Sequence, residues 1–362
     1  MKTLFAGDIC AKADNVKELF KNKDVETLFT NVPTIFKGND INFINLECAL
    51  TDSENAIEKF GPNLKSPKET AEVLKGMGVT LCGVSNNHIF DFGKEGWRDT
   101  EKTLRDAGLD FTGFGENYED SRKSYVYEKD GESVCIIAVC EHEYTYALDD
   151  RMGARPFDCY DTLSDVREAK AKHDRVIVIY HGGKEHCPYP SPRILKTYRA
   201  LAESGADVVL GQHSHCICAY EEYKGSHLFY GQGNFHFIWD GYGIPWNTSL
   251  AVKYDTKTNE LEFIPVMVKG NGITLAEGED KEEIFARLEK FSASLKDGSW
   301  KDGWHDFAVS MKDKYTSVLK YAYTDSEESE WNTRVFGHYL DCEAHTDVWR
   351  ELNKTANETN ER

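Results

Sequence analysis

The stretch Gly205-Ala206-Asp207-Val208-Val209-Leu210-Gly211-Gln212-His213-Ser214-His215 joins a short apolar run to two histidines separated by one residue. The run 207–210 is typical of a buried strand in a parallel sheet. In an open α/β sheet, ligands bind just outside the carboxyl ends of the strands. A lone histidine is more often a core residue, but two imidazoles directly after a strand gain little from packing. His213 and His215 are therefore candidate metal ligands.

Four more polar clusters follow short apolar runs in the same way. The runs are 3–6, 41–44, 79–84 and 175–180, and the clusters after them are Gly7-Asp8-Ile9-Cys10, Asn45-Leu46-Glu47, Asn86-Asn87-His88 and His181-Gly182-Gly183-Lys184-Glu185. One such Asp or Asn is usually a turn residue or a helix N-cap. Five clusters in the same position indicate instead that carboxylate, amide and imidazole groups meet at one edge. That mixture of ligands suits a divalent transition-metal ion.

Helices are predicted between these runs, as an α/β fold requires. They cover residues 70–76, 96–107, 162–173 and 192–204, and hairpins are expected over 124–139 and 249–268. From residue 277 the chain is charged, carries four tryptophans and shows no strand pattern. We therefore predict one domain over 1–270 and a helical extension over 271–362. The extension either packs over the metal cleft or serves as a stabilising or dimerising appendage.

Composition narrows the class of protein. The formal net charge of −19 in 362 residues argues against a nucleic acid as the partner. No apolar run is long enough for a membrane span. The chain opens directly on a predicted strand, without room for a signal peptide, so we expect a cytoplasmic protein. The ten cysteines are scattered and are typical of reduced core residues, and a homo-oligomer is compatible with this composition.

The order of these motifs resembles that of the CapA family, the bacterial capsule and poly-γ-glutamate synthesis proteins, which belong to the calcineurin-like metallophosphatase superfamily. The resemblance runs over roughly residues 1–268. Its most specific parts are the stretch 205–215 and Asn86-Asn87-His88-Ile89-Phe90-Asp91-Phe92-Gly93, and Gly231-Gln232-Gly233-Asn234-Phe235 closes it. The resemblance implies an α/β fold of four layers, αββα, that is, a metallophosphatase-like β-sandwich flanked by helices.

The resemblance also implies two divalent ions, manganese, iron or zinc, and a role for each residue around them. The implied metal ligands are Asp8, Glu47, Asn87, His181, His213 and His215, with Glu47 as the bridge. His88 would exchange a proton with the leaving group or stabilise charge on phosphorus, a task suited to an imidazole. Asp91 would hold the ring of His88 in one tautomer, or else cap the helix that follows.

The first motif departs from the phosphoesterase pattern Asp-x-His, because Cys10 replaces the histidine. Cys10 is either a thiolate ligand or a small buried residue, and in the second case one metal site is weakened. A compact zinc cluster over 213–218 is a further alternative, although its ligands would have to converge from opposite faces of a strand. Three weaker candidates lie around the substrate: Glu185 as a ligand, an orienting carboxylate or a hydrogen-bond partner of His181, and Arg193 or Arg155 as a planar fork for a substrate anion.

Two functions fit these observations. The first is metal-dependent hydrolysis of a phosphate ester, with a small phosphorylated or anionic substrate. The second is a component of capsule or poly-γ-glutamate synthesis that binds the polymer or assists a ligase without hydrolysing phosphate. An acidic chain is poorly suited to holding a polyanion, so the hydrolase is the prediction. The fold alone does not decide between the two.

Overall fold

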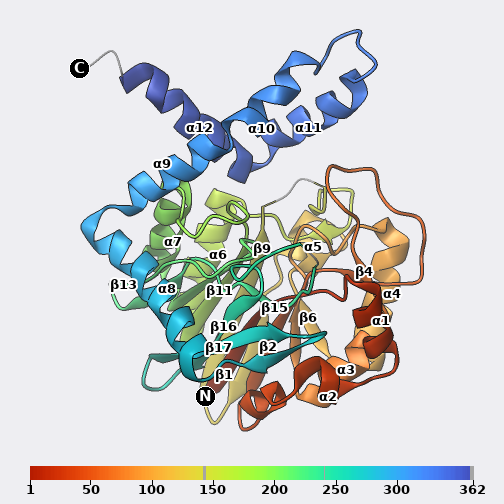
Figure 1. Ribbon diagram of the computed structural model, residues 1–362. Helices are drawn as coiled ribbons and strands as arrows, with labels where there is room; N and C mark the ends of the chain where they lie inside the picture. Colours follow the sequence, from red (N-terminus) through yellow and green to blue (C-terminus); the bar gives the residue numbers. More distant parts are fainter. Residues whose placement is uncertain (142–143, 240, 359–362) are drawn as a thin grey trace.

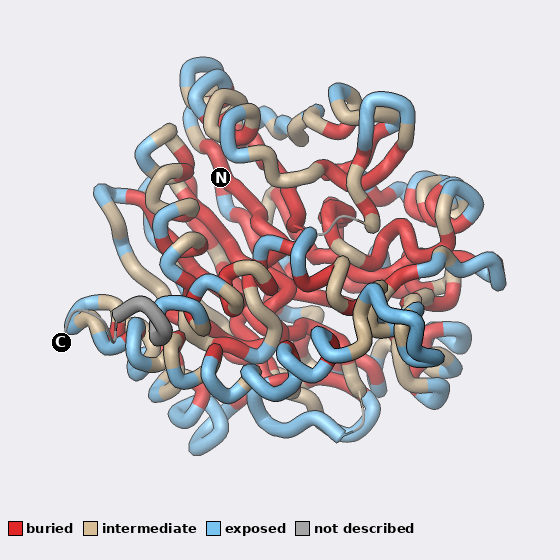
Figure 2. The backbone as a smooth tube through the Cα atoms, turned by 90° about the horizontal axis from the view of Figure 1, so that it is seen from above, coloured by how far each residue is buried: buried red, intermediate tan, exposed pale blue. Residues whose placement is uncertain are grey.

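Two β-sheets packed face to face form the centre of the molecule, with helices on both outer faces (Figure 1). The computed structural model describes residues 1–141, 144–239 and 241–358. Figure 2 shows buried backbone running through the centre and exposed backbone around the periphery.

The first sheet has eight strands, with the first strand of the chain inside it. Its order is β18 (Gly272–Leu275), β17 (Glu260–Lys269), β16 (Thr248–Asp255), β1 (Lys2–Ile9), β2 (Ile41–Leu46), β5 (Leu81–Gly83) and β6 (Asp110–Thr112), and β15 (Asn234–His236) also pairs with β1. β1, β2, β5 and β6 are parallel, whereas β16 to β18 are antiparallel. The four parallel strands therefore end at the same edge.

The second sheet has six strands. Its order is β13 (Tyr220–Tyr223), β14 (Ser226–Phe229), β12 (Val208–Gln212), β11 (Arg175–His181), β9 (Glu132–Cys140) and β8 (Tyr125–Lys129). His181 at the end of β11 is paired with Gln212 on one side and Cys140 on the other, so three parallel strands end together here as well. Two small ladders lie outside the main sheets, β3 (Ala49–Leu50) with β4 (Lys65–Ser66) and β7 (Phe114–Gly115) with β10 (Gly153–Ala154).

The central strands are apolar on both faces because both faces are covered. Along β9, Ile136 points into the core between the sheets and Ile137 points toward the outer helices. Phe5 and Phe43 of the first sheet enter the same inter-sheet core, with their ring centroids 5.6 Å apart.

Helices complete the outer layers. Those on the first sheet are α1 (Asp14–Lys21), α2 (Val25–Phe29), η1 (Val32–Phe36), α3 (Thr70–Met77) and α4 (Gly93–Asp106); those on the second are α6 (Cys159–Lys172) and α7 (Pro192–Ser204), and the short α5 (Tyr118–Ser121) follows β7. The predicted four-layer αββα sandwich is confirmed.

The bounds of α7 follow from local chemistry. The Oγ of Ser191 accepts a hydrogen bond from the backbone of Ile194 at 3.2 Å, and Pro192 occupies the first turn, where its missing N–H costs nothing. Gly205 ends the helix with φ 119°, a left-handed conformation that favours glycine. The helix thus covers the predicted residues 192–204 and leads directly into β12.

The chain beyond β18 is helical. Its elements are α8 (Gly278–Asp297), α9 (Trp300–Ser310), α10 (Lys312–Ser317), η2 (Val318–Lys320), α11 (Ser329–Asp341) and α12 (Glu343–Glu358). α8 packs on the inter-sheet core, and α9 to α12 share an apolar cluster with Phe60, Cys187 and Tyr189 of the main fold (Figure 1). The first sheet extends past residue 270 through β18, and the division of the chain there stays a prediction. Among the described residues, no helix combines the length and apolar character needed to cross a membrane.

Gly7 is expected to tolerate no side chain. A Cβ on Gly7 would lie 2.1 Å from the backbone oxygen of Gly233, just before β15 pairs with β1. Gly7→Ala should therefore lower the free energy of unfolding by roughly 1–3 kcal/mol or more. Gly76→Ala in α3 is the control, because a Cβ there meets open space, and it should raise the same quantity by up to about 1 kcal/mol. Urea unfolding measures both, and equal effects would contradict the prediction.

Candidate metal centre

Polar side chains from both sheets meet where the carboxyl ends of the strands come together. At or just after these ends are Asp8 on β1, Glu47 after β2, Asn87 after β5, His181 on β11, and His213 and His215 after β12. Three of the strands belong to the first sheet and two to the second. The groups therefore meet across the junction of two sheets, not along the edge of one.

His181 contacts groups from both sheets. Its Nε2 lies 2.8 Å from Oδ1 of Asn87 and 3.3 Å from Oε1 of Glu47. On the other side of the ring, Nδ1 lies 3.1 Å from Nδ2 of Asn45, and the same amide nitrogen donates to Oδ1 of Asp8 at 2.7 Å. Asn45 therefore orients two candidate ligands at once. Its position two residues before Glu47 in the sequence did not predict this role.

His213 and His215 reach the site because the loop after β12 has an unusual backbone. Their φ angles are 80° and 53°, in the left-handed region that residues other than glycine rarely adopt. The backbone N–H of His213 donates to Oδ2 of Asp8 at 3.1 Å, and Nδ1 of His215 lies 2.8 Å from Oδ1 of Asn234. The ring centroid of His213 is 4.9 Å from that of His181 and 5.8 Å from that of His215.

Glu47 is the residue that most needs a cation. It is fully buried, and neither carboxylate oxygen has a hydrogen-bond partner in the described part of the chain. Its oxygens belong to two groups of potential ligand atoms that lie within 4.8 Å of one another, one with His181 and His213 and one with Asp8 and His215. Buried charges in proteins are paired or bind metals. The residues are therefore compatible with divalent ions held on both sides of Glu47.

Burial raises the pKa values of the carboxyl groups in this cluster and lowers those of the imidazoles. It raises the pKa of Asp8 to about 7 and the pKa of Glu47 well above its usual value. It lowers the pKa of His215 to about 4, and the pKa values of His181 and His213 fall well below the usual value. The fold by itself thus favours neutral acids and neutral imidazoles. A divalent cation favours ionised carboxylates, so its binding would release protons.

His88 stands next to Asn87 and is held by two charged groups. Its Nδ1 lies 2.7 Å from Oδ2 of Asp91 and 3.2 Å from Nζ of Lys59, and Lys59 is ion-paired with Asp91. Burial and then Lys59 lower the pKa of His88, while Asp91 opposes them. Asp91 does not cap the next helix, because the N-cap of α4 is Phe92. Lys59 belongs to no motif, so no sequence pattern pointed to it.

Of the three weaker candidates, Glu185 lies at the cluster, with Oε1 3.9 Å from Nε2 of His213. Arg193 instead forms an ion pair with Glu141, a buried carboxylate after β9 that no sequence motif marked. Its Nε also lies 2.9 Å from Asp347 of α12. Arg193 therefore links the main fold to the C-terminal helices, and its predicted contact with a substrate stays a prediction.

Arg155 is not brought to this cluster. Its side chain is buried, with one guanidinium nitrogen 2.5 Å from Oδ2 of Asp165 and the other 2.8 Å from the backbone oxygen of Arg122. Both guanidinium nitrogens are therefore engaged by groups inside the protein. The structure therefore gives no support to Arg155 as a group that binds substrate.

The cysteines near the motifs lie in apolar surroundings. Cys10 belongs to the core under the first sheet, and burial together with Cys48 raises the pKa of its thiol well above the usual value. This favours the small buried residue over the thiolate ligand. Cys216 and Cys218 pack in the core on the outer face of the second sheet, and among the described residues neither shares a group of close ligand atoms with the two histidines before them.

Aromatic rings form one wall of the site. The ring of Trp246 lies with its centroid 4.4 Å from that of His215, and Tyr242 stacks on Trp246 at 4.2 Å. Tyr242 is 40 % exposed, so this wall extends to the protein surface. No sequence pattern marked these rings as neighbours of the metal ligands.

Glu185 connects the site electrostatically with the C-terminal helices. Burial acts to raise its pKa. The charges of Lys184 and His215 act against burial, together with those of His186 and His345, and they hold the pKa below its usual value. Since His345 lies on α12, the helical extension reaches the neighbourhood of the candidate ligands.

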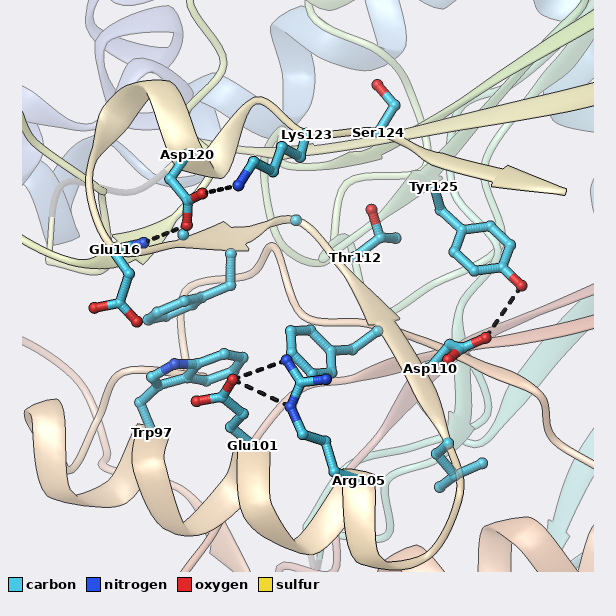
Figure 3. Close-up of a pocket in the computed structure, with 15 residues that line it drawn as sticks. Trp97, Glu101, Arg105, Asp110, Thr112, Glu116, Asp120, Lys123, Ser124 and Tyr125 are labelled. Atoms are coloured by element: carbon cyan, nitrogen blue, oxygen red, sulfur yellow. Dashed lines mark hydrogen bonds and ion pairs between the residues drawn. The ribbon is translucent and has the colours of Figure 1, made fainter.

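A separate pocket of about 370 Å³ lies between α4, β6 and the start of β8 (Figure 3). Most of its charged groups have a partner within the pocket, and Glu116 pairs with Arg98 outside it. Arg105 bonds to Glu101, Lys123 to Asp120, and Tyr125 to Asp110. None of the predicted site residues lines this pocket, so it adds nothing to the metal chemistry.

Comparison with known proteins gives consistent matches. The family profile described as "Bacterial capsule synthesis protein PGA_cap" matches residues 2–238. "PGA biosynthesis protein CapA" of Bacillus subtilis (strain 168) is 30% identical over 259 residues, which cover 70% of this chain and 67% of that protein. "Capsule biosynthesis protein CapA" of Bacillus anthracis is 28% identical over 290 residues, covering 76% and 70%. Among solved structures, a putative 5'-nucleotidase from Staphylococcus aureus is 14% identical, with a TM-score of 0.43, over 80% of this chain and 58% of that one.

The pKa of Asp8 predicts a pH-dependent stability in the presence of a chelator. The folded chain keeps the Asp8 proton up to about pH 7, whereas the usual value is 3.8, so the wild type loses stability as the pH rises through this window. Asp8→Asn removes that loss, which corresponds to about 4 kcal/mol. The difference in free energy of unfolding between variant and wild type should therefore increase from pH 4 to pH 7.

Urea unfolding at several pH values measures this difference. Asp130→Asn, at an exposed turn, is the control and should differ from the wild type by a constant amount. A flat difference for Asp8→Asn would show that its carboxyl group ionises normally in the fold.

Proposed function

The chain belongs to the family of bacterial capsule synthesis proteins PGA_cap, and on this basis we propose that it is a metal-dependent hydrolase of phosphate esters. The observation that carries the proposal is the buried carboxylate of Glu47, which has no hydrogen-bond partner among the described residues and lies between two groups of imidazoles and carboxylates. A binding surface for a polymer has no need for such a costly arrangement.

The metal would be held by residues of both sheets. In this proposal the ligands are Asp8, Glu47, Asn87, His181, His213 and His215. Two divalent ions in such a site lower the pKa of water and neutralise the charge of a phosphate group. Asn45 and Asn234 orient the ligands beside them, because each amide lies within hydrogen-bond distance of a ligand imidazole.

His88 would carry out the proton transfer to or from the leaving oxygen. Asp91 accepts the N–H at Nδ1, which leaves Nε2 as the atom that exchanges a proton with the leaving oxygen. Lys59 forms a buried ion pair with Asp91, and its ammonium group lies beside the ring of His88. An anionic substrate next to His88 counters the effect of Lys59 and favours the protonated imidazole that the leaving group requires.

A second candidate is a role in polymer synthesis without hydrolysis. It rests on the relatives, which include the two CapA proteins and a "Probable polyglutamine synthesis accessory protein" of Mycobacterium tuberculosis, 25% identical over 277 residues. The formal net charge of −19 weighs against direct binding of a polyanionic polymer, because like charges repel. The two candidates differ in one measurable property, the turnover of phosphate esters.

Two histidine variants should separate metal binding from proton transfer. His213→Ala removes a candidate ligand, so bound metal and phosphatase activity should fall together. His88→Asn should keep the metal and lose turnover by roughly two to four powers of ten, the usual effect of deleting a positioned acid or base. Metal content and rate are measured on the same samples, with added Mn²⁺.

The control is His173→Asn, a half-buried histidine in the loop after α6, which should change neither quantity. Wild-type protein that binds two metal ions yet hydrolyses no ester in a broad panel would refute the hydrolase and support the second candidate. Loss of metal in His88→Asn would show that His88 acts in metal binding and not in proton transfer alone.

A further inference from the structure

The corner between α11 and α12 brings together two imidazoles and a thiol. His338 lies in the last turn of α11, Cys342 follows that helix, and His345 lies in the first turn of α12. Each offers one ligand atom, and the three atoms lie within 4.8 Å of one another. The residues are 8 %, 2 % and 9 % exposed, so the cluster is set inside the protein.

Local backbone structure fixes the spacing of these residues. The backbone N–H of Cys342 donates to the oxygen of His338 at 2.9 Å, and that of His345 donates to the oxygen of Cys342 at 3.0 Å. Between the two bonds, Cys342 takes an extended conformation with φ −82° and ψ 120°, which turns the chain from one helix to the next. Eight consecutive residues thus present all three side chains on the inner side of the corner.

The ring of His345 is oriented as metal-binding histidines usually are. The hydroxyl of buried Tyr315 bonds to its Nδ1 and fixes the plane of the ring, as groups that orient metal-binding histidines do. The ring centroids of His338 and His345 are 4.7 Å apart with their planes at 67°. In this arrangement the edge of one ring points toward the other, and the space between them adjoins Cys342.

The ligand set is softer than that of the central site. One thiol and two imidazoles favour zinc and related ions, whereas carboxylates and amides favour harder ones. A tetrahedral zinc ion with bonds of about 2.0–2.3 Å places its ligands roughly 3.3–3.8 Å apart, which small side-chain rotations would reach here. We infer that His338, Cys342 and His345 bind a second kind of metal ion, of the zinc class.

The ion would fix the corner between α11 and α12. On each side of this corner, one contact joins the helices to residues near the central site. On the α11 side, the rings of His338 and Tyr339 lie 5.1 and 6.1 Å from Phe60, the residue next to Lys59. On the α12 side, Asp347 is ion-paired with Arg193. Fixing the angle between the helices therefore fixes both contacts. These residues lie beyond 238, outside the family match, so the site is a property of this chain's extension.

X-ray absorption and zinc titration test the inference on the full chain. The double variant His181→Ala, His213→Ala removes two of the six candidate ligands of the central site to weaken metal binding there, and after treatment with a chelator it should still bind one zinc per chain at the corner. The zinc spectrum should show one sulfur ligand at about 2.3 Å. Zinc should also raise the midpoint of thermal unfolding of this variant.

Further substitutions in the same background identify the ligands. Cys342→Ser should remove the sulfur ligand and weaken zinc binding at least 100-fold, and Tyr315→Phe should weaken it about 10–100-fold, as for other groups that orient a ligand. Cys187→Ser is the matched control, since Cys187 is a buried thiol in the same apolar cluster and should leave the spectrum unchanged. Tyr315→Phe keeps the inference testable if Cys342→Ser does not fold.

Two outcomes would overturn the inference. One is the absence of bound zinc in the folded double variant, which would show that the histidines serve packing alone. The other is a sulfur ligand that survives Cys342→Ser or disappears in Cys187→Ser. Both outcomes are read from the sulfur ligand and from the corner variants, so neither decides the function of the central site, which has no cysteine among its candidate ligands.

Discussion

The burial of two carboxylates, Asp8 and Glu47, at the junction of two sheets is the constraint on which the rest of the site depends. An ionised carboxylate that leaves water loses several kcal/mol of solvation unless partners replace the solvent. Asp8 receives such partners from the side chain of Asn45 and the backbone of His213. Glu47 receives none among the described residues and is surrounded by imidazoles instead. The groups around that carboxylate are compatible with a bound divalent cation.

The two-sheet architecture supplies ligands that one sheet could not. Parallel strands end together in each sheet, and face-to-face packing brings the two sets of strand ends within side-chain reach. The loop after β12 still has to turn sharply, and the left-handed conformations of His213 and His215 cost of order 1–3 kcal/mol each. The strands around the loop are rigid and buried, so they can hold that strained backbone in place.

Much of the fold could be predicted from the sequence because its signals are local. Apolar runs ending in polar clusters located the strands, and the helical stretch 192–204, followed by Gly205, located α7. What could not be predicted depends on tertiary packing. Nothing local distinguishes Lys59 from a surface lysine, yet packing buries it beside His88 and Asp91. In the same way, Arg155 forms an internal ion pair with Asp165. The sequence alone cannot distinguish such an arginine from one that binds a substrate.

The pairing of β1 with β16 has a consequence for how the limits of this protein are drawn. The family profile matches the chain up to residue 238, but β16, which lies antiparallel against the first half of β1, starts at Thr248. A chain cut at the recognised limit would leave the apolar edge of β1 open, and such edges drive aggregation. Asp8, a candidate metal ligand inside the family match, therefore lies on a strand that is completed by residues beyond the end of that match.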